Sequence, residues 1–303
     1  MVKKISLLIG IISFILMGCG NKVDDQALES LSSALEKRWE FTDQLPDEIT
    51  MEDLNKAIQI ELDELEEYDI DDFKDTILYS HYSGYKSNLE LMQITMKNES
   101  IDSNSFQEKW KEHMEKRAKF LHDINSKYTL KISDENNEIF KEVLTSANNL
   151  VKKDEIKDQL SEIKGITDLE VTIEDDSISV SFPTESVLSV DSFVSKKTGF
   201  PENAMNILKK LKENDFNHIV ISTTNQDSIA ISTYFTKDTL DNVNIDEWEE
   251  LDSHDAYKLY GMSDAYNIRI GIWESLDIET TQLIRNMNKD SNNEFWKKYG
   301  FNQ

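Results

Sequence analysis

The chain has 303 residues, a formal net charge of −26 and a sequence pI near 4.5. This charge excludes nucleic acid as a partner, because phosphate contacts need a basic face, and it opposes adsorption to anionic lipid. Hydrophobic residues make up 38% of the chain and include 13 Phe, 10 Tyr and 5 Trp, so the body can build packed cores and is not disordered.

The N-terminal residues have the pattern of an export signal. Lys3 and Lys4 are followed by an apolar run from Ile5 to Met17, which is interrupted only by small residues. Its 13 residues are too few for a membrane-spanning helix, which needs about 20. The length is typical of the apolar part of a cleaved signal peptide.

The end of this run, Leu16-Met17-Gly18-Cys19, resembles the lipobox of bacterial lipoproteins. The resemblance implies that Cys19 receives a diacylglyceryl group (palmitate-type acyl chains) and that a signal peptidase cuts between Gly18 and Cys19. Two acyl chains suffice for stable attachment to a bilayer. The alternative is a stray or buried cysteine behind an uncleaved anchor. Cys19 is the only cysteine, so no intramolecular disulfide and no cysteine-based metal site can form.

The rest of the chain divides by the period of its apolar residues. We expect a signal peptide over residues 1–18, a lipidated tether over 19–25, an antiparallel helical bundle over 26–165 and a smaller α+β domain over 166–303. In the bundle, apolar residues recur at helical spacing in five segments. Pro46 ends the first of them. Ser105 and Glu108 form a capping-box pattern at the start of the fourth. Arg117 lies on the apolar stripe and is expected to reach solvent or to pair with a carboxylate.

The order of these helical segments adds a second resemblance. Over roughly residues 19–165, the chain looks similar to the helical region of uncharacterised Gram-positive cell-envelope lipoproteins. The resemblance rests on three stretches: ALESLSSALEKRWEFTDQL, ELDELEEYDIDDFKD and FQEKWKEHMEKRAKFL. This resemblance implies a location and a fold, but no activity.

After Gly165 the pattern changes to alternation, which predicts strands. Two strands around Asp175-Asp176 and two around "NQD" are expected to form hairpins, with a helix from Pro201 to Glu213 between them. The prediction is an antiparallel sheet with a helix packed on one face, in an overall α+β fold. A terminal helix is expected near 292–299, and the role of 242–303 stays open.

Residues 61–75 are the densest acidic stretch, with nine carboxylates among fifteen residues. They could attract a cation, but the segment has no glycine for the turn of an EF-hand. The favoured interpretation is a solvated helix face, with acidic residues near a helix N-terminus. No specific metal site or cofactor is expected.

The spacing of the five histidines predicts no metal or catalytic site that they share. His113 and His122 are nine residues apart and face opposite sides of one helix, and His81 lies on an apolar face. His218 lies at the start of a predicted strand. Asp252, His254 and Asp255 lie close together in a polar stretch and could form a surface metal or acid–base cluster. This interpretation is not favoured, because the third ligand or the substrate pocket would have to come from elsewhere in the chain.

No known catalytic motif is present, and we predict no catalytic residue. The sequence favours a lipid-anchored protein on the extracytoplasmic face of the cell membrane, with a non-enzymatic binding, sensing or scaffold role and a membrane-proximal protein partner. One alternative is a hydrolase of an envelope polymer that uses loop carboxylates, which leave no local signature. The other is a surface-exclusion lipoprotein of a mobile element.

Overall fold

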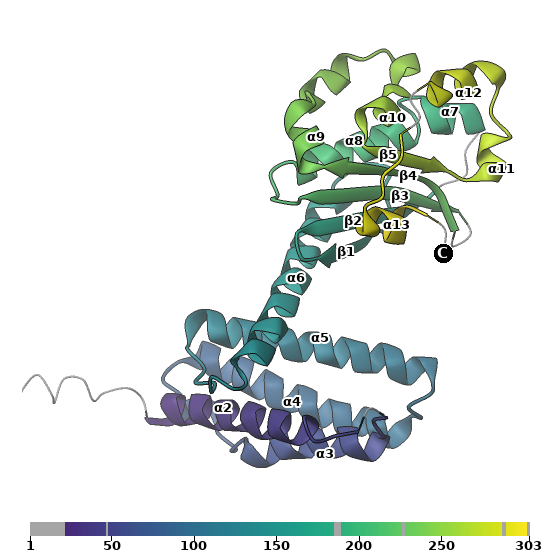
Figure 1. Cartoon of the computed structure of the whole chain (residues 1–303). Coiled ribbons are helices and arrows are strands. Elements are labelled where there is room, and N and C mark those ends of the chain that lie inside the picture. The colour runs from purple at the N-terminus through teal and green to yellow at the C-terminus, as the bar shows by residue number, and fades with distance from the viewer. Residues whose placement is uncertain (1–21, 47, 185–188, 226–227, 287–288, 302–303) are drawn as a thin grey trace, which may run out of the picture. The chain divides into compact units, whose positions relative to one another are not determined.

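The computed structural model describes residues 22–46, 48–184, 189–225, 228–286 and 289–301 (Figure 1). The chain divides into two compact units, one up to Leu150 and one from Val151 onward. The boundary falls inside helix α6 (Asn137–Ser161), whereas the change of apolar period in the sequence predicts it after Gly165. Gly165 itself adopts φ +90°, a conformation that favours glycine.

In the first unit, four helices lie side by side, together with the start of α6 (Figure 1). They are α2 (Lys22–Thr42), α3 (Met51–Glu64), α4 (Thr76–Asn98) and α5 (Asn104–Lys127). Residues 22–25, expected in a tether, belong to α2. Val23 packs against the bundle core, and Asp24 and Asp25 lie in the first turn, where carboxylates interact favourably with the helix dipole.

Side-chain caps set where the bundle helices begin. Thr50 and Asp53 form a capping box at α3, and the Asp75 carboxylate accepts hydrogen bonds from two backbone N–H groups at α4. At α5 the capping residue is Ser103, whose hydroxyl accepts from the N–H of Phe106 at 3.1 Å. The predicted cap at Ser105 is therefore wrong by half a turn.

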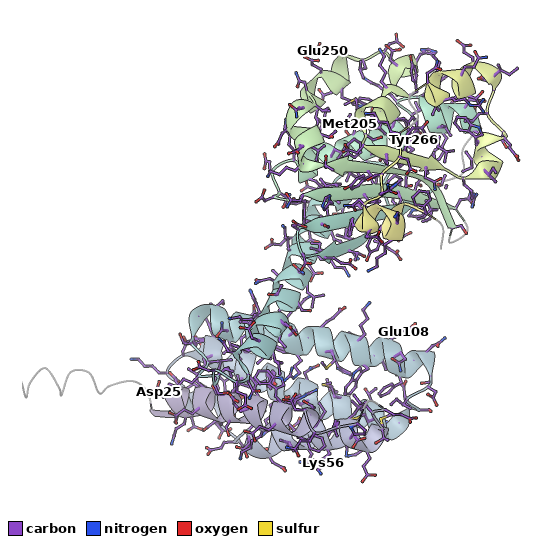
Figure 2. The ribbon with its side chains drawn as sticks, viewed as in Figure 1. Asp25, Lys56, Glu108, Met205, Glu250 and Tyr266 are labelled. Atoms are coloured by element: carbon purple, nitrogen blue, oxygen red, sulfur yellow. The ribbon has the colours of Figure 1, made fainter. Side chains whose placement is uncertain are left out.

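The bundle has its own apolar core, built from residues at helical spacing on each helix. Fully buried members include Leu31, Leu35, Ile58, Tyr85, Leu89, Met92, Phe106, Leu121 and Ile124. Lys56 and Glu108, by contrast, lie on the exposed surface of this unit (Figure 2). Of the described helices, none is both long enough and apolar enough to cross a membrane.

The second unit contains a five-stranded sheet in the order β1-β2-β3-β4-β5. The strands are β1 (Glu170–Glu174), β2 (Ser177–Pro183), β3 (His218–Asn225), β4 (Ser228–Thr236) and β5 (Ala265–Ile268). Three neighbouring pairs are antiparallel, but β2 and β3 are parallel. The prediction of a wholly antiparallel sheet is wrong at this pair. Helices α7 (Val190–Ser195) and α8 (Phe200–Leu211) form the crossover that a parallel pair requires.

The predicted local elements of this unit are confirmed. Strands β1 and β2 form a tight hairpin in which Asp175 has φ 50°, a conformation that Asp tolerates. Strands β3 and β4 pair antiparallel. Pro201 lies in the first turn of α8, and the terminal helix is α13 (Glu294–Gly300).

The two faces of the sheet differ sharply in character. One face carries Ile178, Val180, Phe182, Ile219, Ile221, Ile231 and Phe235, and it packs against the buried side of α8, including Met205 (Figure 2). The other face is rich in serine and threonine, and α13 lies against β3 and β4 on this side. Trp296 of α13 is fully buried there and stacks on Tyr234, with ring centroids 5.8 Å apart.

Short helices complete the apolar side of the second unit. They are α9 (Lys237–Asn242), η2 (Ile245–Glu250), η3 (Ser253–Asp255), α10 (Lys258–Met262), α11 (Ile270–Trp273) and α12 (Ile278–Arg285), while η1 (Ile70–Asp72) belongs to the bundle. Trp248 and Tyr260 anchor them in the core, and the Tyr260 hydroxyl donates to the Val194 carbonyl at 2.8 Å.

Candidate functional site

The predicted lipidation site, Cys19, and the predicted cleavage site between Gly18 and Cys19 lie outside the described residues. Their assignment therefore stays a prediction from the sequence.

The acidic stretch 61–75 does not form a single solvated face. Most of its carboxylates are exposed, but Glu61 is fully buried in the bundle. The interpretation of the whole stretch as a solvated surface is therefore wrong for Glu61. A buried carboxylate requires a partner, because an isolated ion in an apolar interior is strongly unfavourable.

Glu61 is the centre of an ionic cluster to which each of four helices contributes one residue. Arg38 of α2 and Arg117 of α5 approach the same carboxylate oxygen, Oε1, at 2.7 and 2.6 Å. Tyr85 of α4 donates its hydroxyl to Oε2 at 2.5 Å, and Arg117 Nε donates to the same oxygen at 3.3 Å. Both oxygens are thus satisfied, and the prediction that Arg117 pairs with a carboxylate is confirmed.

Charge and burial act in opposite directions on this cluster. Burial alone would raise the pKa of Glu61, but the guanidinium groups of Arg117 and Arg38 outweigh it and hold that pKa below its ordinary value. Burial raises the pKa of Tyr85 far above its usual range. At neutral pH the cluster contains one carboxylate, two guanidinium groups and a neutral phenol. It is 0–8% exposed, so it links the helices and offers no access to a ligand.

The histidines make local contacts instead of forming a common site. His113 is held by Asn88 and Thr95 at 3.0 and 3.2 Å, and burial lowers its pKa. His218 contacts the hydroxyl of Tyr234 at 2.7 Å. His81 and His122 both lie near Asp123, at 3.8 and 3.3 Å.

The predicted polar group at Asp252, His254 and Asp255 is a capped turn. The Asp252 carboxylate accepts from the backbone N–H of His254 and contacts its ring nitrogen, both at 2.9 Å. Asp255 pairs instead with Lys258 at 2.6 Å. Across the described residues, no three His, Cys, Asp or Glu side chains are grouped so that they could hold a metal ion.

The largest of the described cavities, about 830 Å³, lies where β2 ends and the crossover helices begin. We call it the crossover cleft. Phe182 and Pro183 line one side, and the capping residues of α7 and α8, Ser189 and Gly199, line the other. Ligands of open α/β sheets commonly bind at the carboxyl end of parallel strands.

Three polar side chains around this cleft already have partners in the protein. Lys197 Nζ donates to the carbonyl of Glu249 at 2.9 Å. Glu202 accepts from the indole of Trp248 at 3.4 Å, and the hydroxyl of Thr184 contacts that of Thr223 at 2.7 Å. Gly199 is required by close packing, because a Cβ atom there would lie 2.1 Å from the carbonyl oxygen of Phe193.

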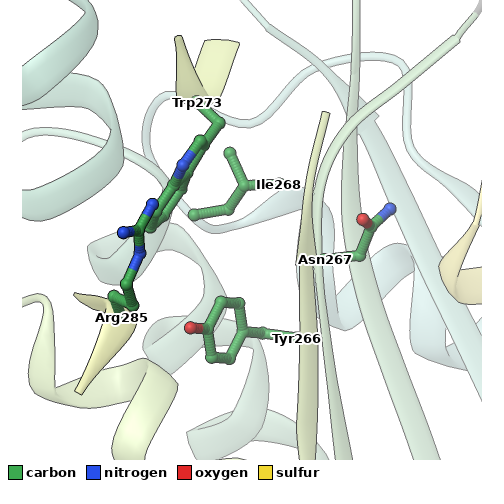
Figure 3. A pocket seen from close by; sticks show the side chains of 5 residues that line it. All are labelled: Tyr266, Asn267, Ile268, Trp273 and Arg285. Carbon is green, nitrogen blue, oxygen red and sulfur yellow. The ribbon is translucent and has the colours of Figure 1, made fainter. Parts of the chain in front are cut away.

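A smaller cavity of about 290 Å³ lies beside β5 (Figure 3). The guanidinium carbon of Arg285 lies 5.8 Å from the centre of the Trp273 ring, within the range of a cation–π contact. Tyr266 donates its hydroxyl to the carbonyl of Ile284 at 3.0 Å. Asn267 points to the opposite side of the strand (Figure 3) and donates to the carbonyl of Gly300 at 3.2 Å.

The third cavity, about 360 Å³, lies on the polar face of the sheet, and we call it the hydroxyl trough. Its floor is formed by Thr172, Ser179, Ser181, Ser222, Thr224 and Ser228. Tyr299 and Phe301 lie at its side, and Glu170 and Lys298 add one charge of each sign. The Tyr299 ring is fixed, because its hydroxyl donates to Glu174 at 2.6 Å.

Sequence reasoning missed both the ionic cluster and the trough. Glu61 looks like its acidic neighbours in the sequence, and its partners come from helices 23 to 56 residues away. The trough did leave a signal, since Ser177, Ser179 and Ser181 alternate with apolar residues in β2. That pattern is equally typical of an ordinary solvated face.

Comparison with known protein families, with curated proteins and with solved structures finds no match to this chain.

Proposed function

We propose that this chain is a lipoprotein of the cell envelope, held on the extracytoplasmic face of the membrane by an acylated Cys19. Its proposed role is non-enzymatic: binding, sensing or scaffolding. The observation that carries the proposal is the sequence Leu16-Met17-Gly18-Cys19 behind a short apolar run and two lysines. Removal of Lys3 and Lys4 with the signal peptide would take the formal charge from −26 to −28.

The start of α2 supports a body close to the membrane. Only three residue steps separate Cys19 from Lys22, where α2 begins, and they span at most about 11 Å. The bundle would therefore lie near the lipid headgroups. Its acidic surface opposes adsorption to anionic lipid, so the acyl chains alone would hold it there.

A protein partner is favoured by two exposed apolar side chains of the second unit. Ile270 and Ile278, at the starts of α11 and α12, are 75% and 77% exposed. They are the most exposed large apolar side chains among the described residues and flank Trp273 in the sequence. Such residues are candidates for the buried centre of an interface.

The hydrolase alternative requires two carboxylates in one cavity, about 5–10 Å apart. In the α+β unit, where loop carboxylates were expected, the described linings of the crossover cleft and of the hydroxyl trough have one carboxylate each, and that of the cavity beside β5 has none. The surface-exclusion alternative differs from our proposal in the identity of the partner and has no specific support in the fold.

The anchor is tested by labelling cells with radioactive palmitate. The wild-type chain should incorporate label and fractionate with the membrane, and Cys19→Ala should abolish both. Ser6→Ala, within the apolar run, is the control and should leave labelling unchanged. Absence of label from the wild-type chain would overturn the proposal.

A further inference from the structure

We propose that the hydroxyl trough binds a neutral oligosaccharide. This inference deepens the proposed binding role by naming a ligand class, but it does not depend on the lipid anchor. It starts from the unusual composition of one sheet face, where six serine and threonine hydroxyls line a single cavity.

The decisive observation concerns the exposure and the hydrogen bonding of two serines in the floor of the trough. Ser222 and Ser179 are only 2% and 6% exposed, yet neither hydroxyl makes a hydrogen bond to any of the described residues. Neither oxygen is among the fully enclosed polar atoms that lack a partner, so both hydroxyls open into the trough, where water or a ligand supplies their hydrogen bonds. Ser232, which faces Ser222 across β3 and β4, shows the contrast, because its hydroxyl donates to the carbonyl of Gly300.

The chemistry of the lining favours a polyhydroxylated ligand. Serine and threonine hydroxyls both donate and accept, and sugar hydroxyls do the same, so the two sets can pair in either sense. The trough residues come from β1, β2, β3 and β4, and three strand spacings extend over about 14 Å. This is long enough for a short oligosaccharide. Tyr299 and Phe301 provide apolar ring surface on which a sugar ring can pack.

Charge selects a neutral glycan over an anionic one. Glu170 lies in the lining, and Glu174 holds Lys298 and Tyr299 at the same side of the sheet. Lys298, the one cation in the lining, is therefore already paired. The whole chain also carries a formal charge of −26, which repels polyanionic polymers. The crossover cleft is larger, but its Lys197 and its one carboxylate, Glu202, already contact groups of the protein.

The test uses the mature chain, residues 19–303, with Cys19→Ala so that no lipid is needed. Chitotetraose, cellotetraose and maltotetraose are titrated by calorimetry and by ¹⁵N NMR. We expect saturable binding of at least one of them, with shift changes centred on Ser179 and Ser222. Polygalacturonate, a polyanionic glycan, should not bind at physiological salt.

Matched serine variants separate recognition from folding. Ser222→Ala removes a hydroxyl that has no partner among the described residues, so the circular dichroism spectrum should stay unchanged while affinity falls about tenfold. Ser195→Ala is the control: it is buried in the same unit, but its hydroxyl donates to the carbonyl of Asp191 at 2.7 Å, and binding should be retained.

Three results would overturn the inference: no saturable binding of any of the three neutral glycans, shift changes confined to the crossover cleft, or equal loss of affinity in the two variants. Binding of polygalacturonate would overturn the choice of a neutral ligand. Because the chain tested is not lipidated, failure here leaves the lipoprotein proposal standing, and absence of palmitate label leaves this inference standing.

Discussion

Glu61→Gln should destabilise the bundle far more than its size suggests. The substitution keeps the shape of the side chain but removes the only carboxylate from a site where Arg38 and Arg117 are 8% and 3% exposed. Breaking a buried ion pair on one side typically costs about 3–5 kcal/mol, because the remaining charge stays buried without compensation.

The matched control lies one turn further along α3. Glu64 pairs with Lys37 at 2.5 Å, but the two side chains are 24% and 52% exposed. Surface pairs of this kind contribute about 0–1 kcal/mol, so Glu64→Gln should be nearly neutral. The two substitutions are chemically identical, and they differ mainly in burial and in the number of charged partners.

Urea unfolding of the non-lipidated chain, followed by circular dichroism, measures the difference. With a slope of about 2 kcal/mol/M, the midpoint of bundle unfolding should fall by about 1.5–2.5 M for Glu61→Gln. Hydrogen exchange in peptides from α3 and α4 should show that the loss lies in the bundle. A Glu61→Gln variant as stable as Glu64→Gln would refute the view that the cluster holds the four helices together.

Further outcomes follow from the same structure. The pKa of Glu61 lies below the ordinary 4.5 in the folded chain, so its ionised form stabilises the fold above that value, and this contribution is lost as the pH falls through the lowered pKa. The stability difference between wild type and Glu61→Gln should therefore shrink as the pH of an acid unfolding series falls below 4.5. Gly199→Ala places a Cβ atom 2.1 Å from a backbone oxygen and should lower the thermal midpoint of the second unit, whereas Gly271→Ala, with no atom within 4 Å, should not. Residues 20–303 should remain unbound to anionic vesicles in co-sedimentation at physiological salt, and tight binding would reveal a membrane-active face.

The parts of the fold that local pattern determines could be predicted from the sequence. Helical spacing identified the bundle, and the alternation around Asp175 identified a hairpin whose turn the structure confirms. The parallel pairing of β2 and β3 could not be predicted in this way, because it depends on how α7 and α8 pack between them in the chain.

The candidate sites were harder to predict because burial decides their chemistry. Glu61 differs from Glu64 only through the helices that surround it, and no local pattern encodes that difference. Ser222 differs from Ser232 only in that the second hydroxyl meets the carbonyl of Gly300 from the distant α13. In both cases the deciding partners lie far away in the sequence.

The most direct test of the central claim is the intact mass of the mature chain purified from the membrane of its native host. Our account predicts the mass of residues 19–303 increased by a diacylglyceryl group, with the modification on the N-terminal peptide that begins at Cys19. A mature chain that retains residues 1–18, or one that begins elsewhere or has an unmodified Cys19 thiol, would contradict it.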